Sequence, residues 1–274
     1  TPIEWRKFWP IRLYGEIVGH FLRQYDYQTS QSPARIATQS VAGGVDYFIA
    51  NSKNVAERIK KFYRRDSTVI YPPVDVIPTE PVGRVEESSE ARLRPRSLDS
   101  LRSLGMTKNN YFLVVSRLEG AKKIDLAISA CNRLGCELWV VGSGSQEEYL
   151  KSISGPTIKF IGRAEDADLA KIYQNCKALI CTATDEDFGI TPVEAMAAGR
   201  PVIAYRGGGY LETVIENKTG LFYPPATPAR SAGGRGDEPT VESLIKTITE
   251  FKSLKFKAED CRKQAEKFSK ERFK

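Results

Sequence analysis

The chain has very little histidine and no long apolar segment. Among 274 residues there is one histidine, His20, and only five cysteines, at positions 131, 136, 176, 181 and 261. No two cysteines form a C-x-x-C pair, and one histidine cannot complete the usual zinc patterns, so a zinc site of that kind is excluded. No signal peptide is present, and no apolar run approaches the roughly 20 residues that cross a bilayer. We therefore expect reduced, mostly buried thiols in a cytosolic protein.

Basic residues outnumber acidic ones, 41 to 34, which gives a formal net charge of +7. Much of the excess lies near the two ends (Arg6, Lys7, Arg12, Arg23; Lys267, Lys270, Arg272, Lys274). A mild excess suits an anionic substrate, a membrane surface or nucleic acid, and it is equally ordinary for a solvated surface. No nucleic-acid-binding motif accompanies the charge, so we expect no nucleic-acid partner.

The segment Trp5 to Tyr25 carries large apolar residues at helical spacing, with arginines and a lysine among them. Such a helix can lie on a membrane interface, which would give peripheral membrane contact. It can equally pack on its own domain. Both interpretations stay open.

The first ordered pattern is a strand–helix–strand unit. Val45 to Asn51 reads as a strand, Ser52 caps a helix from Lys53 to Tyr63, and Val69 to Tyr71 is a short strand stopped by two prolines. Residues 78–102 are polar, charged and proline-containing, which is typical of a linker. We therefore predict a first domain over 1–77, a hinge or linker over 78–106, and a second domain over 107–274.

Strands and helices alternate regularly through the second domain. The expected strands are 111–116, 137–141, 158–161, 178–181 and 201–205, and the expected helices are 125–134, 146–153, 166–176, 191–198, 241–251 and 258–268. This alternation predicts an α/β fold with a parallel, doubly wound sheet. Ligands of such sheets bind beyond the carboxyl ends of the strands, so the loops that follow the strands should share one edge.

The stretch from Thr184 to Gly209 carries most of the chemistry. Glu186 and Glu194 are separated by seven residues. Thr191 is placed to cap a helix, with Pro192 in its first position and Gly199 at its end. Gly207-Gly208-Gly209 indicates a loop where the backbone must approach something closely.

The start of this helix predicts an anion site, because a helix N-terminus presents unpaired N–H groups and a partial positive charge. A diphosphate would fit there. The alternative is a capping box, in which Glu194 only bonds back to the Thr191 N–H. Val141-Gly-Ser-Gly144 lacks the third glycine of a dinucleotide fingerprint, so NAD is rejected.

A second polar loop, Ser116 to Lys123, leaves the first strand of this domain. Its cations Arg117 and Lys122 are five residues apart and could hold the two phosphates of a leaving nucleoside diphosphate, where negative charge develops. Lys123 could substitute for Lys122. The alternative is a pair of surface cations.

Two Asp-x-Asp patterns could hold a divalent cation. Asp166-Ala167-Asp168 opens a helix, where acidic residues are favoured without any ligand. Asp185-Glu186-Asp187 overlaps the central stretch and could in principle bind Mg²⁺. We expect no metal at either place.

The stretch from Thr184 to Gly209, with its two glutamates, helix, Pro-Val-Ile-Ala strand and glycine loop, resembles the signature of retaining GT-B glycosyltransferases of family four. DYFIANSKNVAERIKKFY followed by VIYPPVDV also resembles the end of their N-terminal domain, more closely in the mannosyltransferase-like branch. The resemblance implies a complete C-terminal Rossmann-like domain preceded by part of an N-terminal one. About 75 residues precede the hinge, so we expect a chain truncated at its N-terminus.

The same resemblance implies roles for individual residues. Glu186 would lie beside the donor sugar, Arg117 and Lys122 would hold the diphosphate, and Glu194 would accept hydrogen bonds from the ribose. The remaining donor-binding residues would be Arg163, Phe188, Gly189, Ile190 and Thr191, mainly through their backbone. No metal or other cofactor is implied.

The implied reaction transfers a sugar from a nucleotide sugar to a polysaccharide or a lipid-linked acceptor, in the cytoplasm or at the inner membrane surface. Mannose and guanine, and hence GDP-mannose, rest on the branch resemblance alone. A non-catalytic nucleotide-sugar-binding module, or an inactive fragment, is the alternative.

Overall fold

The computed structural model describes residues 46–74, 110–224 and 239–273. The chain divides into two compact units, Thr1–Ile70 and Tyr71–Lys274, each of which is described by itself. The predicted linker over 78–106, the segment Trp5 to Tyr25 and His20 lie outside the described residues. Along the described part of the chain, no helix combines the length and the apolar character that a membrane span requires.

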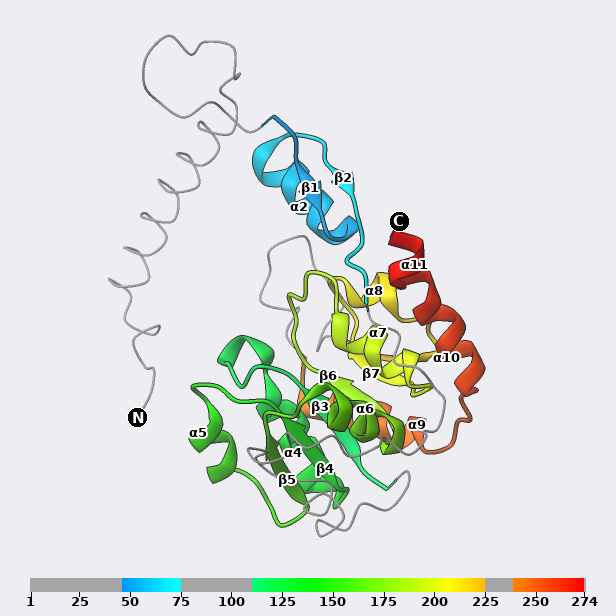
Figure 1. Cartoon of the computed structure of the whole chain (residues 1–274). Helices are drawn as coiled ribbons and strands as arrows, with labels where there is room; N and C mark the ends of the chain where they lie inside the picture. The colour runs from blue at the N-terminus through cyan, green and yellow to red at the C-terminus, as the bar shows by residue number, and fades with distance from the viewer. Residues whose placement is uncertain (1–45, 75–109, 225–238, 274) are drawn as a thin grey trace, which may run out of the picture. The chain divides into compact units, whose positions relative to one another are not determined.

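The first unit contains the predicted strand–helix–strand arrangement (Figure 1). Strand β1 (Ile49–Ala50) pairs in parallel with β2 (Thr68–Val69), and helix α2 (Lys53–Tyr63) connects them. The Ser52 hydroxyl accepts a hydrogen bond from the Val55 N–H at 3.0 Å, which confirms the predicted N-cap. Both strands are shorter than the sequence pattern predicted.

The second unit is built on a six-stranded sheet in the order β5-β4-β3-β6-β7-β8, and every neighbouring pair is parallel. The strands are β3 (Phe112–Val115), β4 (Leu138–Val141), β5 (Ile158–Gly162), β6 (Leu179–Cys181), β7 (Val202–Tyr205) and β8 (Gly220–Tyr223). Five of them were predicted. Strand β8 was not predicted, because only a short apolar run follows its glycine. The doubly wound α/β fold is confirmed.

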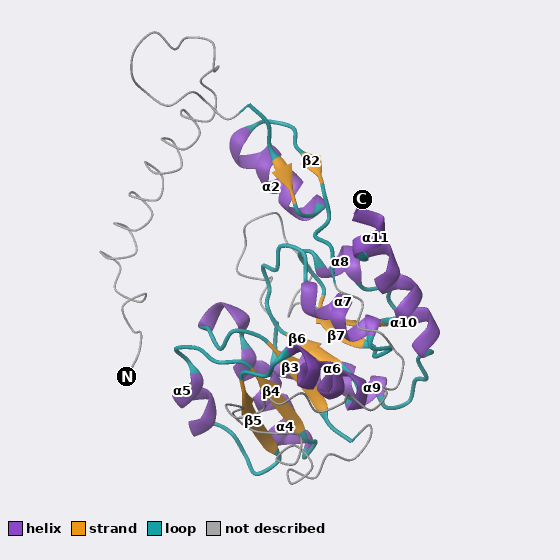
Figure 2. Cartoon of the chain, viewed as in Figure 1, coloured by secondary structure: helices purple, strands orange, loops and turns teal. Residues whose placement is uncertain are grey.

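Helices pack against the sheet in two groups (Figure 2). Helices α4 (Ile124–Leu134) and α9 (Val241–Phe251) pack together, and α7 (Ile190–Ala197) packs with α6 (Asp166–Asn175) and α10 (Ala258–Ala265). The shorter elements are η2 (Gly120–Lys122), α5 (Glu147–Ser152), α8 (Tyr210–Thr213), η4 (Glu266–Phe268) and α11 (Lys270–Phe273).

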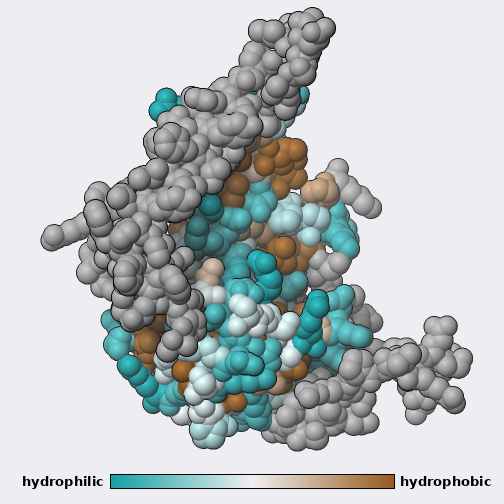
Figure 3. Space-filling view, turned by 90° about the vertical axis from the view of Figure 1, so that its left-hand side faces the viewer, coloured by the Kyte–Doolittle hydropathy of each residue, from teal (hydrophilic) through white to brown (hydrophobic). Residues whose placement is uncertain are grey.

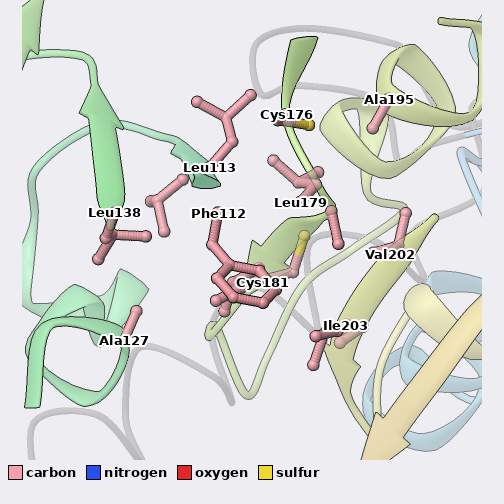
Figure 4. Close-up of a cluster of buried hydrophobic side chains, with 14 of the residues drawn as sticks. Phe112, Leu113, Ala127, Leu138, Cys176, Leu179, Cys181, Ala195, Val202 and Ile203 are labelled. Atoms are coloured by element: carbon pink, nitrogen blue, oxygen red, sulfur yellow. The ribbon is translucent and has the colours of Figure 1, made fainter. Parts of the chain in front are cut away.

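The core lies between the sheet and these helices, and Figure 4 shows side chains of β3, β4, β6, β7, α4 and α7 gathered in it. Phe112 of β3 meets Phe251 of α9 edge-on at 6.0 Å, whereas Tyr111, directly before β3, donates its hydroxyl to the Ile172 carbonyl of α6. The strands are continuous apolar runs because both faces of the sheet are covered.

All five cysteines are buried and no disulfide joins them, as the sequence predicted. Figure 3 shows small apolar groups scattered over a mostly hydrophilic described surface.

Candidate functional site

The sheet reverses its winding between β3 and β6, which is where such sheets open a ligand site. The chain runs outward from β3 to β4 and β5, then returns to β6 on the other side of β3. The loops that leave β3 and β6 therefore diverge from adjacent strands at the carboxyl edge. The Thr182 hydroxyl, just after β6, donates to the Lys122 carbonyl at 2.6 Å and fastens these two loops together.

An ion pair joins the two loops at this point. The Lys122 ammonium lies 2.7 Å from Glu186 Oε2, and both side chains are about three-quarters buried, with 24% and 23% exposed. The Tyr210 hydroxyl lies 3.4 Å from the same Glu186 oxygen, a long hydrogen bond. The structure thus brings together two of the predicted catalytic residues, which are 64 positions apart in sequence.

The loop that follows β3 packs closely against the loop that follows β4, because two glycines in the second loop leave room for the backbone of the first. A Cβ on Gly142 would lie 1.9 Å from the Ser116 carbonyl oxygen, and one on Gly144 would lie 2.5 Å from that of Leu118. The Leu118 N–H donates to the Ser143 carbonyl at 3.0 Å. The Gly-Ser-Gly sequence therefore serves close packing of two backbones.

The glycine loop fixes the segment that carries Glu186. The Gly209 N–H donates to the Glu186 carbonyl at 2.8 Å. A Cβ on Gly208 would lie 2.5 Å from that carbonyl oxygen, and one on Gly209 would lie 2.4 Å from Phe188 Cα. The close approach predicted for Gly207-Gly208-Gly209 is confirmed, and what these glycines approach is the protein's own site loop.

Helix α7 begins earlier than predicted. Its N-cap is Gly189, with φ 90°, and no side chain caps it. The Thr191 cap was wrong, because Thr191 lies inside the first turn and its hydroxyl hydrogen-bonds the buried Cys181 thiol instead. The end of the helix was right: the Gly199 and Arg200 N–H groups bond back to the Met196 and Ala195 carbonyls in a Schellman arrangement.

Because Thr191 is not the N-cap, the capping box that was the alternative interpretation of Glu194 is absent from the described α7. Glu194 instead accepts a hydrogen bond from the Tyr173 hydroxyl of α6 at 2.8 Å. Burial raises the pKa of Glu194, the Tyr173 hydrogen bond lowers it, and the charge of Asp166 raises it. The Gly189 cap also leaves the first N–H groups of α7 without side-chain caps at the edge where Lys122 and Glu186 meet.

Phe188 does not point toward this edge. Its side chain is 2% exposed and contacts the rings of Tyr71 and Phe268, at centroid distances of 5.7 Å and 5.3 Å. The Tyr71 hydroxyl donates to Glu212 at 2.9 Å. The Phe188 side chain is therefore turned into the protein, whereas that of Ile190 is half exposed.

The other two predicted site residues, Arg117 and Arg163, are exposed on loops that follow β3 and β5. The pKa of Glu119, on the same loop as Arg117, is lowered mainly by hydrogen bonds from Ser145 and, to a smaller extent, by the positive charge of Arg117. Arg163 is exposed directly after β5, two strands from β3.

Sequence reasoning missed three residues of this site: Tyr173, Thr182 and Tyr210. Tyr173 has the helical spacing of a core residue, and Thr182 and Tyr210 only follow an apolar strand and a glycine loop. None of them carries a local signal, because each gains its role through a contact distant in sequence.

Comparison with known proteins assigns the family. The model of the family described as "Glycosyl transferases group 1" matches residues 101–268. The chain belongs to this family. The match includes every residue of the site described above except Tyr71.

The curated relatives of this family member are mannosyltransferases and other glycosyltransferases. The chain is 28% identical over 223 residues to alpha-1,3/1,6-mannosyltransferase ALG2 of Dictyostelium discoideum, which covers 70% of this chain and 52% of that protein. It is 26% identical over 222 residues to the Homo sapiens protein of the same name, covering 71% and 50%. The chain therefore spans about half the length of these relatives.

Solved structures show the same fold. Anabaena Alr3699/HepE in complex with UDP-glucose superposes with a TM-score of 0.64 at 20% identity, covering 93% of this chain and 66% of that one. A glycosyltransferase from Rickettsia africae superposes with a TM-score of 0.63 at 21% identity, covering 83% and 60%. The second unit of this glycosyltransferase-family chain is thus the Rossmann-like domain of a GT-B fold.

Proposed function

We propose that the chain binds a nucleoside-diphosphate sugar at the carboxyl edge of the sheet, and that the protein transfers the sugar to an acceptor with retention at the anomeric carbon. The observation that carries the proposal is the Lys122–Glu186 pair at the point where the sheet reverses. The family match and the name of the UDP-glucose complex support it.

The Lys122–Glu186 pair would supply a cation for the diphosphate of the donor and a carboxylate for its sugar. In the free chain the carboxylate of Glu186 holds the ammonium of Lys122 in place. When a donor binds, Lys122 would turn to the diphosphate, and Glu186 would contact the sugar hydroxyls and stabilise positive charge at the anomeric carbon. Lys122, Arg117 and the first N–H groups of α7 would then offset the negative charge that develops on the leaving diphosphate.

The rest of the donor would lie along the same edge. Glu194 would accept from the ribose hydroxyls, the backbone near Gly189 and Ile190 would contact sugar and phosphate, and Arg163 would flank the base. Mannose, from GDP-mannose, is proposed because the ALG2 relatives are named mannosyltransferases. The acceptor is proposed as a polysaccharide or lipid-linked glycan. The transfer is proposed to need no metal and to take place on the cytoplasmic side, with peripheral membrane contact.

The proposal is tested by separating the phosphate contact from the sugar contact. GDP, UDP, GDP-mannose and UDP-glucose are titrated by calorimetry into the wild-type chain and into Lys122→Met and Glu186→Gln. A charge-assisted hydrogen bond is worth about 1.5–3 kcal/mol, so Lys122→Met should weaken diphosphate binding about 10- to 100-fold. Glu186→Gln should keep or improve the diphosphate affinity, since it releases Lys122, and should lose the added affinity of the sugar.

The chain offers a matched control pair at the opposite edge of the sheet. Lys159 and Glu137 form an ion pair of 2.8 Å with 32% and 22% of their side chains exposed, near the amino ends of β4 and β5. Lys159→Met should leave all four affinities unchanged. Equal losses in Lys122→Met and Lys159→Met, or no diphosphate binding at all, would overturn the proposal.

Catalysis is separated from simple binding by an assay of donor hydrolysis and transfer. Wild-type turnover that disappears in Glu186→Gln, with an NMR spectrum showing the donor's anomeric configuration in the product, supports a retaining enzyme. Donor binding without turnover would make the chain a nucleotide-sugar-binding module.

A further inference from the structure

Tyr173 is a buried side chain with one polar contact in an otherwise apolar setting. It lies on α6, is fully buried, and its hydroxyl donates to Glu194 Oε2 at 2.8 Å. Burial raises the pKa of this phenol well above its ordinary value, as does the neighbouring Glu194 charge to a lesser degree. The hydroxyl therefore stays protonated and acts as a fixed hydrogen-bond donor.

The acceptor of that bond, Glu194, is a partly buried carboxylate in a helix that is otherwise mostly buried. The neighbours of Glu194 in α7, including Val193, Ala195 and Met196, are fully buried and apolar. Burying a carboxylate costs free energy, and one hydrogen bond offsets only part of that cost. The capping box that could have given Glu194 a structural role is absent. The Tyr173 hydroxyl is therefore the side-chain partner that fixes the orientation of this carboxylate.

We propose that Tyr173 is a positioning residue that holds Glu194 in the orientation needed to accept hydrogen bonds from the two ribose hydroxyls of the nucleotide. The inference rests on the proposed function, which makes Glu194 the ribose acceptor. The Tyr173 hydroxyl occupies one carboxylate oxygen and restrains a side chain with three rotatable bonds, so less freedom is lost when the nucleotide binds. Tyr173 itself does not touch the ribose, because it has no exposed surface.

The test compares the binding of GDP with that of 2′,3′-dideoxy-GDP, which lacks both hydroxyls, and repeats the comparison with the uridine pair. The quantity of interest is the ratio of the two dissociation constants, because general damage to the fold weakens both nucleotides alike. We expect Tyr173→Phe to weaken GDP binding about 5- to 10-fold and to leave the dideoxy nucleotide unchanged, since the ring and its packing remain.

The matched control is Tyr111→Phe. Tyr111 is also buried, with 1% exposed, and its hydroxyl donates at 2.8 Å to the Ile172 carbonyl, next to Tyr173 in α6. This variant loses a buried hydroxyl of the same kind without touching Glu194. Its ratio of dissociation constants should equal that of the wild type.

Glu194→Ala makes the two levels of failure distinguishable. If Glu194→Ala abolishes the preference for the ribose and Tyr173→Phe preserves it, Tyr173 is no more than a core residue and the inference is overturned. If Glu194→Ala also preserves the preference, the ribose contact assigned to Glu194 is wrong and the inference falls with it. If neither GDP nor UDP binds the wild-type chain, the proposed function itself has failed.

A crystal structure of the wild-type chain with GDP supplies a second measurement that holds even if Tyr173→Phe does not fold. We expect the Tyr173–Glu194 bond to persist and the other carboxylate oxygen to lie within hydrogen-bond distance of the ribose. A Tyr173 hydroxyl that has released Glu194, or a ribose bound elsewhere, would overturn the inference.

Discussion

Two glycines with nearly the same positive φ angle allow the shape of the site loop to be tested. Gly208 and Gly135 have φ angles of 57° and 59°. A Cβ on Gly135 would meet nothing within 4 Å, whereas a Cβ on Gly208 would lie 2.5 Å from the Glu186 carbonyl oxygen and 3.1 Å from its nitrogen. Alanine at either position must therefore adopt a positive φ, and of the two variants only Gly208→Ala collides with the segment that carries Glu186.

The magnitudes follow from this geometry. Placing a non-glycine residue in the left-handed region costs about 1–2 kcal/mol of folding free energy, and both variants should be destabilised by this amount. To reach even the 3.0 Å limit of real Cβ contacts, the Glu186 backbone must retreat by about 0.5 Å in Gly208→Ala. Overpacking of this kind costs about 1–3 kcal/mol more. Each kcal/mol lowers Tm by about 2–4 °C in a domain of this size.

The assay is thermal unfolding of both variants followed by titration with a nucleotide sugar and with the free nucleoside diphosphate. Gly208→Ala should unfold at a clearly lower temperature than Gly135→Ala. It should also lose sugar-dependent affinity, because displacing the Glu186 backbone disturbs its 2.7 Å contact with Lys122. Gly135→Ala should bind both ligands like the wild type. Equal stability losses in the two variants, together with unchanged sugar affinity in Gly208→Ala, would refute the reasoning.

Two further variants test the electrostatics and the packing around the site. Burial raises the pKa of Glu194 above its ordinary value of 4.5 in the folded chain, so the stability it contributes is present below pH 4.5 and is lost as the pH rises through the raised pKa. The Tm of Glu194→Gln relative to the wild type should therefore increase from pH 4 to pH 7 in a series of melting curves; a difference that is constant with pH would contradict this. Burial and the hydrogen bond to Glu212 raise the pKa of Tyr71 to about 12. Tyr71→Phe should cost only about 0.5–1.5 kcal/mol of unfolding free energy in urea, because the ring contacts with Phe188 and Phe268 remain, and Tyr71→Ala should cost more.

The sequence predicted elements well where local rules and packing agree. Helix α9 has the predicted bounds, Val241–Phe251, because the Thr240 hydroxyl caps it by accepting from the Ser243 N–H, and one apolar face meets the sheet. The end of α7 at Gly199 was also predicted correctly, because a glycine is the usual residue after a helix. The parallel sheet followed from continuous apolar strands alternating with helices, so the shared edge of the site loops was predictable before any contact was known.

The start of α7 shows why local rules fail at the site. Thr191, Pro192 and Glu194 satisfy every local criterion for a capped helix start. The backbone instead turns at Gly189, and the Thr191 hydroxyl finds a partner in Cys181 of the neighbouring strand. A tertiary contact outweighs a local one here, and no pattern in the stretch Thr184 to Gly209 reveals that partner.

That failure bears on what Glu194 is for. A glutamate in a capping box stabilises its own helix and needs no ligand. Glu194 makes no such contact, is partly buried and has a raised pKa, so as a carboxylate it lowers the stability of the fold. A charged group kept at a cost in stability, on a helix that begins at the carboxyl edge of a doubly wound sheet, agrees with the proposal that a ligand uses it. Glu186 differs, since Lys122 already balances its charge, and in the proposed function Glu186 contributes by exchanging that partner when a donor binds.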